Sequence, residues 1–305
     1  MSVSHHIGLE IAERSFRFVE MQQQDRQSTI LRADILETSH DYSSPLLFDL
    51  PFHTELARDF IRDLATIFHR HSVFASSLSI VLPSMLPLVA MLPLDEALPR
   101  SEQRKQLDWE CKALGGHAAD TALTILTHEL SGVKKTLAVA LPTACVDFLN
   151  STCDHLTLGL TAIDTDHFVM ENVVRKLYPH DASGTFAVLG LFSDHCAAGL
   201  YSGGEYRGFR QTSLTYKEHF AAQTVRLIES LPGFHQAGRL SHVYVYGSAA
   251  ADDVIDALVE ILKCTVVRCV PMADTLVSNP ILQSMRDKGE YFFDAAASAA
   301  LLGLA

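Results

Sequence analysis

The sequence predicts an α/β protein of two lobes, with a smaller subdomain inserted in the first lobe. The main observation is a repeated phrase at residues 6–20 and 186–200, in which an apolar strand, a tight polar turn and a returning strand follow one another. The second observation is the order after each hairpin, which is strand, helix and strand in both halves. The chain has 305 residues, 48% of them hydrophobic, which is enough for two buried cores.

The first half contains the elements of one such lobe. Apolar and polar residues alternate over 6–20 and about 28–38, a pattern typical of a strand meander. Apolar residues at helical spacing then predict one amphipathic helix across 52–70. The remaining elements predicted for this lobe are a strand at Ser77–Leu82, a helix at Thr143–His155, a strand at Leu160–Asp164 and a crossover helix at Asp166–Leu177.

Residues 83–141 interrupt the first lobe and predict a separate subdomain. Its expected elements are a strand at Leu86–Leu94, a polar helix at Ser101–Leu114 and strands at Ala122–Glu129 and Thr136–Leu141. Gly115 and Gly116 end the helix, because glycine readily adopts the left-handed conformation of a helix C-terminus. Three prolines in the apolar stretch 77–94 exclude a membrane-spanning helix there.

The second half repeats the order of the first. The predicted elements are strands at 186–192, 197–202 and 206–213, a helix at Tyr216–Leu231, a strand at Val243–Tyr246, a helix at Asp252–Leu262 and a strand at Thr265–Cys269. The apolar, alanine-rich stretch at the end predicts a buried terminal helix with Asp294 near its N-cap.

Composition limits the functional class. With 24 Lys and Arg against 36 Asp and Glu, the formal net charge is −12, which argues against nucleic acid and suits a basic peptide. The six cysteines contain no CxxC pair, so we expect reduced, buried thiols and no metal site. The polar start of the sequence has no apolar core of a signal peptide, which predicts a cytoplasmic protein.

Four segments together resemble the actin-like family of type IV pilus assembly proteins called PilM, whose relatives include the cell-division protein FtsA. They are the hairpin Gly8–Glu20, the insert segment Leu107–Glu110, the crossover Ala162–Asp164 and the second hairpin 186–207. The resemblance implies a two-lobed actin-like fold, a duplicated ribonuclease-H-like architecture with an inserted subdomain. It places the first lobe at 1–178, with the insert at about 83–141 and a closing C-terminal helix at 290–305, and the second lobe at 179–289.

The resemblance also implies a function. Members of the family sit at the cytoplasmic face of the inner membrane, hold nucleotide between the lobes and bind the cytoplasmic tail of a membrane-anchored partner. From the motif positions, the insert residues Leu107, Trp109 and Glu110 are the expected partner-binding residues. Taken alone, Trp109 as the single tryptophan is more often a packing anchor than a site.

The nucleotide motifs depart from the family pattern in both turns. If nucleotide binding is retained, the expected residues are Glu10, Ala12 and Glu13 in the first turn, Ser193 and Asp194 in the second, and Gly247 and Ser248 at the adenine position. Ala12 adds a Cβ where the family tends to have glycine, and Glu13 adds negative charge. In the second turn, Gly190 replaces an acid, and Leu191 and Phe192 replace small residues.

Two carboxylates at the crossover allow two interpretations. Asp164 and Asp166 are either acids of a nucleotide site or caps of the helix that follows, and base rates favour the cap. The sequence therefore predicts a nucleotide-degenerate scaffold without catalysis or cofactor, which binds an inner-membrane partner in a pilus or type II secretion-like assembly. The alternative is an active ATPase that uses ATP, Mg²⁺, Glu10 and Asp194.

Overall fold

The computed structural model describes residues 3–25, 27–95, 97–130, 135–179, 184–214, 220–235, 237–273 and 275–304. Contacts divide the chain into two compact units. Unit 1 comprises residues 1–86, 143–173 and 270–305, and unit 2 comprises residues 87–142 and 174–269. In sequence the insert interrupts unit 1, whereas its contacts group it with unit 2. The predicted lobe boundaries stay a prediction.

Unit 1 is built on a six-stranded sheet in the order β14-β3-β2-β1-β4-β8. Its strands are β1 (Ser4–Ala12), β2 (Ser15–Gln24), β3 (Gln27–Glu37), β4 (Ser77–Leu82), β8 (Gly159–Thr165) and β14 (Leu276–Val277). Its helices are α1 (Leu46–Asp49), the 3-10 turn η1 (Leu50–Phe52), α2 (Thr54–Arg70), α4 (Thr143–His155), the first part of α5 (Asp166–Leu177), α8 (Asn279–Lys288), the 3-10 turn η4 (Glu290–Phe293) and α9 (Asp294–Gly303).

The sheet of unit 1 combines an antiparallel meander with a set of parallel strands. β1, β2 and β3 are antiparallel neighbours, whereas β1, β4 and β8 run parallel. The register places Arg17 opposite Glu10, Glu10 beside Val81, and Val81 beside Asp164. These four side chains therefore form one row across the sheet, near the carboxyl ends of the parallel strands.

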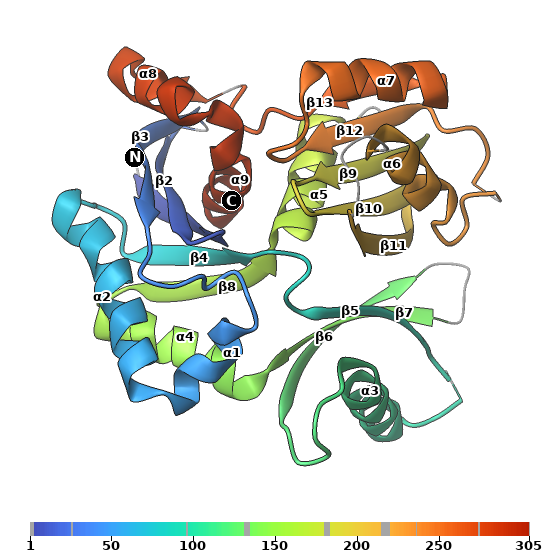
Figure 1. The fold of residues 1–305 in the computed structure, drawn as a ribbon, viewed down its shortest axis with the longest axis horizontal. Coiled ribbons are helices and arrows are strands. Elements are labelled where there is room, and N and C mark those ends of the chain that lie inside the picture. Colours follow the sequence, from blue (N-terminus) through green and yellow to red (C-terminus); the bar gives the residue numbers. More distant parts are fainter. Residues whose placement is uncertain are drawn as a thin grey trace. The chain divides into compact units, whose positions relative to one another are not determined.

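Helix α9 covers one face of this sheet, and a glycine allows its close approach (Figure 1). A Cβ added at Gly8 would lie 1.8 Å from the carbonyl oxygen of Ala296, so only glycine fits there. Ala296, Ala300 and their neighbours pack against Val19 and Met21 of β2. The alanine-rich sequence of α9 is thus explained by a helix that lies directly on β1.

The opposite face of the sheet is covered by α2 and α4 through an aromatic cluster. Phe60 of α2 meets Phe16 of β2 edge to face, with ring centroids 5.4 Å apart. The same ring contacts Tyr42 and, at 5.7 Å, Phe148 of α4. The amphipathic helix predicted over 52–70 is confirmed, and its apolar stripe is the surface that forms this cluster.

Unit 2 contains a five-stranded sheet in the order β11-β10-β9-β12-β13 and a three-stranded sheet in the order β5-β7-β6. The strands are β5 (Leu88–Pro93), β6 (Leu123–Leu130), β7 (Lys135–Pro142), β9 (Thr185–Leu191), β10 (His195–Ser202), β11 (Glu205–Ser213), β12 (His242–Tyr246) and β13 (Thr265–Arg268). The helices are α3 (Arg100–Gly115), α6 (Phe220–Glu229) and α7 (Asp252–Leu262). The predicted helix start at Tyr216 lies outside the described residues.

The five-stranded sheet repeats the topology of unit 1. An antiparallel meander is followed by two parallel strands, as in β3-β2-β1-β4-β8. Helices α6 and α7 cover one face, where Leu189, Leu191 and Cys196 pack against Ile228 and Leu258. The prediction of a duplicated α/β fold from the repeated hairpin phrase is confirmed.

The three-stranded sheet forms the insert together with α3. Its core contains Leu92, Leu107, Cys111, Ala138 and Ala140. Gly116 adopts a φ of 65° at the C-terminus of α3, which confirms the predicted glycine stop. β6 contacts β11 within unit 2 through the rings of His128 and Tyr206, whose centroids are 5.8 Å apart.

Candidate functional site

The first turn (residues 12–15) joins β1 to β2 in unit 1, and its backbone is used within the unit. Glu13 and Arg14 both have positive φ values, 22° and 45°, at positions where glycine would be less strained. The Arg14 amide donates to Asp41 at 3.5 Å, and the Arg14 carbonyl accepts from the Thr38 amide at 2.8 Å. One N–H of the turn that could hold phosphate is therefore directed at a carboxylate.

Glu10, the acid before this turn, is paired with an arginine. Its Oε1 atom lies 3.3 Å from the Arg17 guanidinium, and the Glu10 residue is 5% exposed. Arg17 also lies over the ring of Phe292, 4.7 Å from the centroid. Burial raises the pKa of Glu10 to about 7; Arg17 opposes this shift, while Asp166 and Glu13 add to it.

Asp166 has a local structural role at the start of α5. Its Oδ1 atom accepts hydrogen bonds from the amides of Ser84, at 3.0 Å, and His167, at 2.6 Å. The Thr165 hydroxyl accepts from the Phe168 amide at 3.3 Å, so Thr165 is the N-cap side chain. The helix has the N-cap that the sequence favoured, but the capping side chain is that of Thr165 and not that of Asp164 or Asp166.

Asp164 lies in a different environment from Asp166. It lines a pocket of unit 1, and its Oδ1 atom accepts from the Thr165 amide at 2.7 Å. The pKa of Asp164 is raised to about 6, mainly by burial and in smaller part by the nearby carboxylates of Glu171 and Asp166. Within the described residues, no group of three or more acidic, histidine or cysteine side chains is arranged to hold a metal ion.

The second turn (residues 191–195) belongs to unit 2 and is packed with aromatic rings. Phe192 stacks on His195, with centroids 4.5 Å apart and planes inclined by 11°. Tyr246 meets Phe192 edge to face at 5.9 Å and lies over Gly190. A Cβ at Gly190 would be 2.5 Å from the Tyr246 hydroxyl, so the space at the position of the family's second acid is filled by Tyr246.

The predicted residues of the second turn do not form an acidic site. The Asp194 carboxylate is 78% exposed and accepts from His195 Nδ1 at 2.7 Å. The Asp194 backbone carbonyl accepts from the Leu214 amide at 2.6 Å. Cys196 is buried beside His195, and burial raises its pKa to about 12, so the neighbouring histidine does not make a reactive thiolate.

The adenine-position turn contacts the second turn directly. Gly247 has a φ of 100°, and a Cβ there would be 2.4 Å from the Leu191 carbonyl oxygen. That carbonyl accepts from the Ala249 amide at 3.0 Å. The first turn of α7 contains Asp252 and Asp253, whose charge opposes an anion at this helix N-terminus. Gly247 and Ser248 thus lie beside the second turn in a setting unfavourable to phosphate, and their role at an adenine position stays a prediction.

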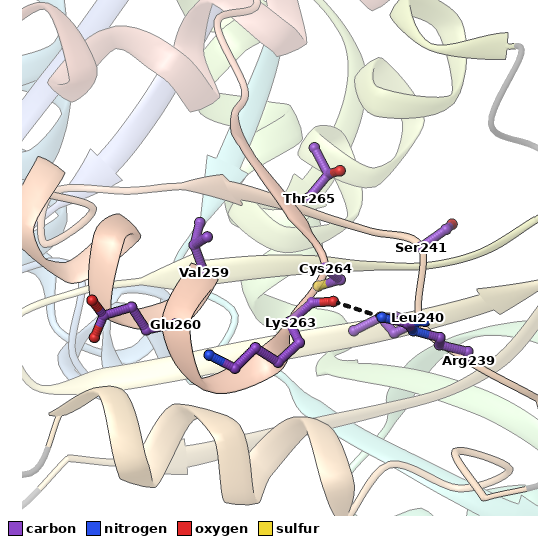
Figure 2. A pocket seen from close by; sticks show the side chains of 8 residues that line it. All are labelled: Arg239, Leu240, Ser241, Val259, Glu260, Lys263, Cys264 and Thr265. Atoms are coloured by element: carbon purple, nitrogen blue, oxygen red, sulfur yellow. Dashed lines mark hydrogen bonds between the residues drawn. The ribbon is translucent and has the colours of Figure 1, made fainter.

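The wider pocket of unit 2 lies at the opposite end of α7, away from these turns. It is lined by Arg239, Lys263, Cys264 and five neighbouring residues and has a volume of about 710 Å³. Figure 2 shows the Arg239 guanidinium bonded to the Lys263 carbonyl, at 3.2 Å, while the Lys263 side chain extends away from it. Lys263 ends the helix with a φ of 53°, so these cations complement the negative end of the helix dipole.

The insert places its three predicted residues differently. Leu107 is 8% exposed and belongs to the core under the three-stranded sheet. Trp109 is 69% exposed, so the interpretation of Trp109 as a packing anchor is wrong. Glu110 accepts a hydrogen bond from Gln106 at 2.9 Å on the same helix. Of the three, Trp109 and Glu110 remain able to contact a partner.

Sequence reasoning missed Arg17, which pairs with the acid before the first turn, and Tyr246, which fills the space of the missing second acid. The hairpin register contains the signal for Arg17, because a two-residue turn at Glu13 and Arg14 pairs Glu10 with Arg17. The close approach of Tyr246 could have been inferred from Gly190, because a glycine in an otherwise apolar strand often marks a position where another group lies very close. Tyr246 pairs with Gly190 across parallel strands.

No protein-family model and no curated protein matches this sequence. Solved structures do match it. One is the PilM-PilN type IV pilus biogenesis complex, with a TM-score of 0.72, 13% identity and 98% of both chains covered. Another is a Bacteroides thetaiotaomicron protein of unknown function with an actin-like ATPase fold, with a TM-score of 0.55, 11% identity, and 89% of this chain and 95% of that chain covered.

The fold and these comparisons define the class: this is an α/β protein with the actin-like fold, duplicated in two parts. Among solved structures it is similar to the PilM-PilN complex along almost its whole length, as the sequence motifs predicted. No helix among the described residues has both the length and the apolar character needed to cross a bilayer.

Proposed function

We propose that this chain is an actin-like scaffold that has lost nucleotide binding and acts by holding a segment of another protein. Its proposed setting is a type IV pilus or type II secretion-like assembly, at the cytoplasmic face of the inner membrane. The fold likeness to the PilM-PilN complex supports the setting, because that structure is itself a complex of pilus biogenesis proteins. Fold alone does not define function, so the proposal depends on the two turns.

The observation that carries the proposal is that side chains of the chain itself pair with the acid at the first position and fill the space of the acid at the second. Arg17 binds Glu10 in unit 1, and Tyr246 lies over Gly190 in unit 2. An acid held by a guanidinium is not available to orient the water shell of Mg²⁺. At the second turn, Phe192 stacks on His195 and Tyr246 lies over Gly190, so aromatic rings fill the space where a phosphate group would need close approach to the backbone.

Calorimetric titration with Mg-ATP tests the loss of nucleotide binding. We expect no measurable heat of binding, because neither turn offers a free acid with glycine beside it. Circular dichroism on the same sample controls for folding. Micromolar binding overturns the proposal, as does a crystal soaked with adenylyl-imidodiphosphate in which residues 11–14 and 191–194 surround the phosphates.

The proposed partner surface includes the exposed face of α3 in the insert. Trp109 is 69% exposed, and large exposed aromatic side chains are frequent centres of binding energy in protein interfaces. The proposed ligand is the short cytoplasmic segment of an inner-membrane assembly protein, bound in an extended or helical form. Glu110, beside Trp109, would contribute a carboxylate to a basic segment.

A binding assay with cytoplasmic tails of single-span membrane proteins from adjacent genes tests the partner surface. Trp109→Ala should weaken binding about tenfold or more, the usual loss at an interface centre. Val259→Ala is the matched control, since Val259 is 41% exposed on α7 of unit 2. Equal affinity of Trp109→Ala and the unmodified protein would remove α3 from the proposed interface.

One observation favours the alternative of an active ATPase. The pKa of Glu10 is raised to about 7, a value suited to proton transfer near neutral pH. In that case the cofactors would be ATP and Mg²⁺, with Asp194 as the second acid. Release of phosphate that disappears in Glu10→Gln would establish this alternative in place of the scaffold.

A further inference from the structure

Unit 1 contains a small pocket on the α9 side of the sheet, beside β4 and the edge strand β8. Its volume is about 210 Å³, and its lining includes Ser79, Thr161, Asp164, Val169 and Leu302. A cavity of this size holds several waters or the end of one side chain. Thr161 is exposed, so the pocket opens to solvent at the β8 edge.

The hydroxyl protons at one end of the pocket are all committed to neighbouring atoms. Thr161 donates to the Leu78 carbonyl at 2.8 Å, so its proton is used. The Ser79 hydroxyl lies 3.2 Å from Thr161 and 2.9 Å from His6 Nε2, and in either tautomer of His6 its proton goes to one of these two acceptors. His6 Nδ1 lies 2.7 Å from the Ser77 hydroxyl, which also has the His5 carbonyl within 3.4 Å. Burial lowers the pKa of His6 to about 4, so the ring is neutral and has only one N–H to donate.

This chain of hydrogen bonds leaves only acceptors facing the pocket. A hydroxyl oxygen has two lone pairs, and Ser79 and Thr161 each use at most one of them. A ligand at this end therefore meets oxygen lone pairs and no free hydroxyl proton. Ser79 is 6% exposed, which makes an unused acceptor there costly unless a donor approaches it.

Asp164 adds a carboxylate to the same pocket. The backbone amide of Thr165 is its hydrogen-bond donor, and within the described residues no basic side chain forms an ion pair with it. Ser79 precedes Val81 by two residues on β4, and Val81 is the register partner of Asp164. Ser79 and Asp164 are therefore diagonal neighbours on adjacent strands, about 7–8 Å apart, and both line the pocket, so one ligand group seated between their side chains can contact both.

We propose that this pocket binds the ammonium end of a lysine side chain. An ammonium group has three donors and no acceptor, which matches a floor made of a carboxylate and two hydroxyl oxygens with committed protons. The apolar lining residues Val169, Ala299 and Leu302 suit the hydrocarbon stem of lysine. A guanidinium is planar and larger, and its bidentate geometry needs both oxygens of a carboxylate, whereas the Oδ1 atom of Asp164 already accepts from the Thr165 amide.

The source of the lysine is a protein segment that docks on unit 1. This part of the inference rests on the proposed scaffold function, whereas the pocket chemistry does not. The formal net charge of −12 favours a basic segment over an acidic one. A lysine seated here would place the segment along the β8 edge, where Thr161 and Ala162 are exposed.

The probe for the test is N-acetyl-lysine N-methylamide, which carries the side chain on a peptide-like backbone. Binding is followed by titration of the NMR methyl signals of Ala299 and Leu302 in the full chain. The expected Kd is on the order of 1 mM, as for a ligand of this size. N-acetyl-norleucine N-methylamide has the same stem without the charge, and the corresponding arginine derivative has the larger cation; both should bind about tenfold more weakly or worse.

Three variants locate the binding. Asp164→Asn should weaken the binding of the lysine probe about tenfold or more. Thr161→Val keeps the shape of the side chain and removes its oxygen, so it should weaken binding several-fold through the loss of one charge-assisted hydrogen bond. Asp154→Asn is the matched control, because Asp154 is exposed on α4 and its substitution removes the same charge from the same unit. Methyl spectra without probe show whether each variant is folded.

The outcomes separate this inference from the scaffold proposal. Saturable lysine binding that depends on Asp164 and Thr161 but not on Asp154 supports the pocket. Absence of methyl shifts, equal binding of the norleucine derivative, or binding unchanged in Asp164→Asn overturns it. Any of these three results leaves the tail-binding assay on Trp109 as it stands, because that assay does not use this pocket.

Discussion

The pH dependence of stability at Glu10 follows directly from its burial. Burial raises the pKa of Glu10 from 4.5 to about 7 in the folded protein, whereas the unfolded chain has the ordinary value. Between these values the folded state binds more protons than the unfolded state, so the free energy of unfolding falls as pH rises. At about 1.36 kcal/mol for each pH unit between the two values, the full cost is about 3 kcal/mol. Most of it, about 2–3 kcal/mol, develops between pH 5 and pH 8.

Glu10→Gln removes this titration while keeping an oxygen for Arg17. Urea unfolding at pH 5 and at pH 8 gives the change in free energy for each protein. The unmodified protein should lose about 2–3 kcal/mol more than Glu10→Gln over this interval, because every other titrating group is common to both. The difference in free energy of unfolding between the two proteins at a single pH is not compared, because it also includes the cost of leaving Arg17 without its carboxylate partner.

Glu37→Gln is the matched control for this measurement. Glu37 is exposed on β3 of the same unit, so its removal should leave the pH dependence within a few tenths of a kcal/mol. An identical pH dependence in Glu10→Gln and the unmodified protein would refute the reasoning. It would mean that Glu10 stays ionised in the folded protein through its pairing with Arg17.

Three further substitutions test the packing of unit 1 and the insert by chemical unfolding. Gly8→Ala should destabilise unit 1 by about 3 kcal/mol or more, because the new Cβ would lie 1.8 Å from the Ala296 carbonyl oxygen and α9 must shift. Phe60→Ala should cost about 3–5 kcal/mol, since the side chain is fully buried against Phe16 and its neighbours. Trp109→Ala should change the free energy of unfolding by less than about 0.5 kcal/mol, because the residue is 69% exposed.

Each of these has a contrary result. Gly8→Ala with unchanged stability would show that α9 does not lie directly on β1. A small loss in Phe60→Ala would contradict the aromatic cluster on the second face. A large loss in Trp109→Ala would restore the interpretation of this residue as a packing anchor.

Most of the fold could be predicted from the sequence because local signals define its elements. The helices Thr143–His155, Asp166–Leu177 and Asp252–Leu262 begin and end where the sequence places them. The repeated hairpin phrase predicted the duplicated topology, since a turn between two short strands fixes register over a few residues.

The candidate sites were less accessible because they depend on neighbours far apart in sequence. Tyr246 reaches Gly190 only because β12 runs parallel to β9, and no local pattern fixes that pairing. The pocket at Asp164 needs His6, Ser79 and Thr161 from three strands, together with the C-terminal part of α9. Hydrogen-bond direction at a buried histidine is likewise a property of the assembled network.

The close contact of α9 with β1 has a consequence for biosynthesis. Val19 and Met21 of the second strand are covered by Ala296, Ala297 and Ala300, which are translated more than two hundred and seventy residues later. Until the ribosome has released that segment, one surface of the first sheet has no cover and exposes apolar side chains to water. We therefore expect nascent chains arrested before residue 294 to depend on chaperones, and unit 1 to become resistant to protease only once α9 has left the ribosome.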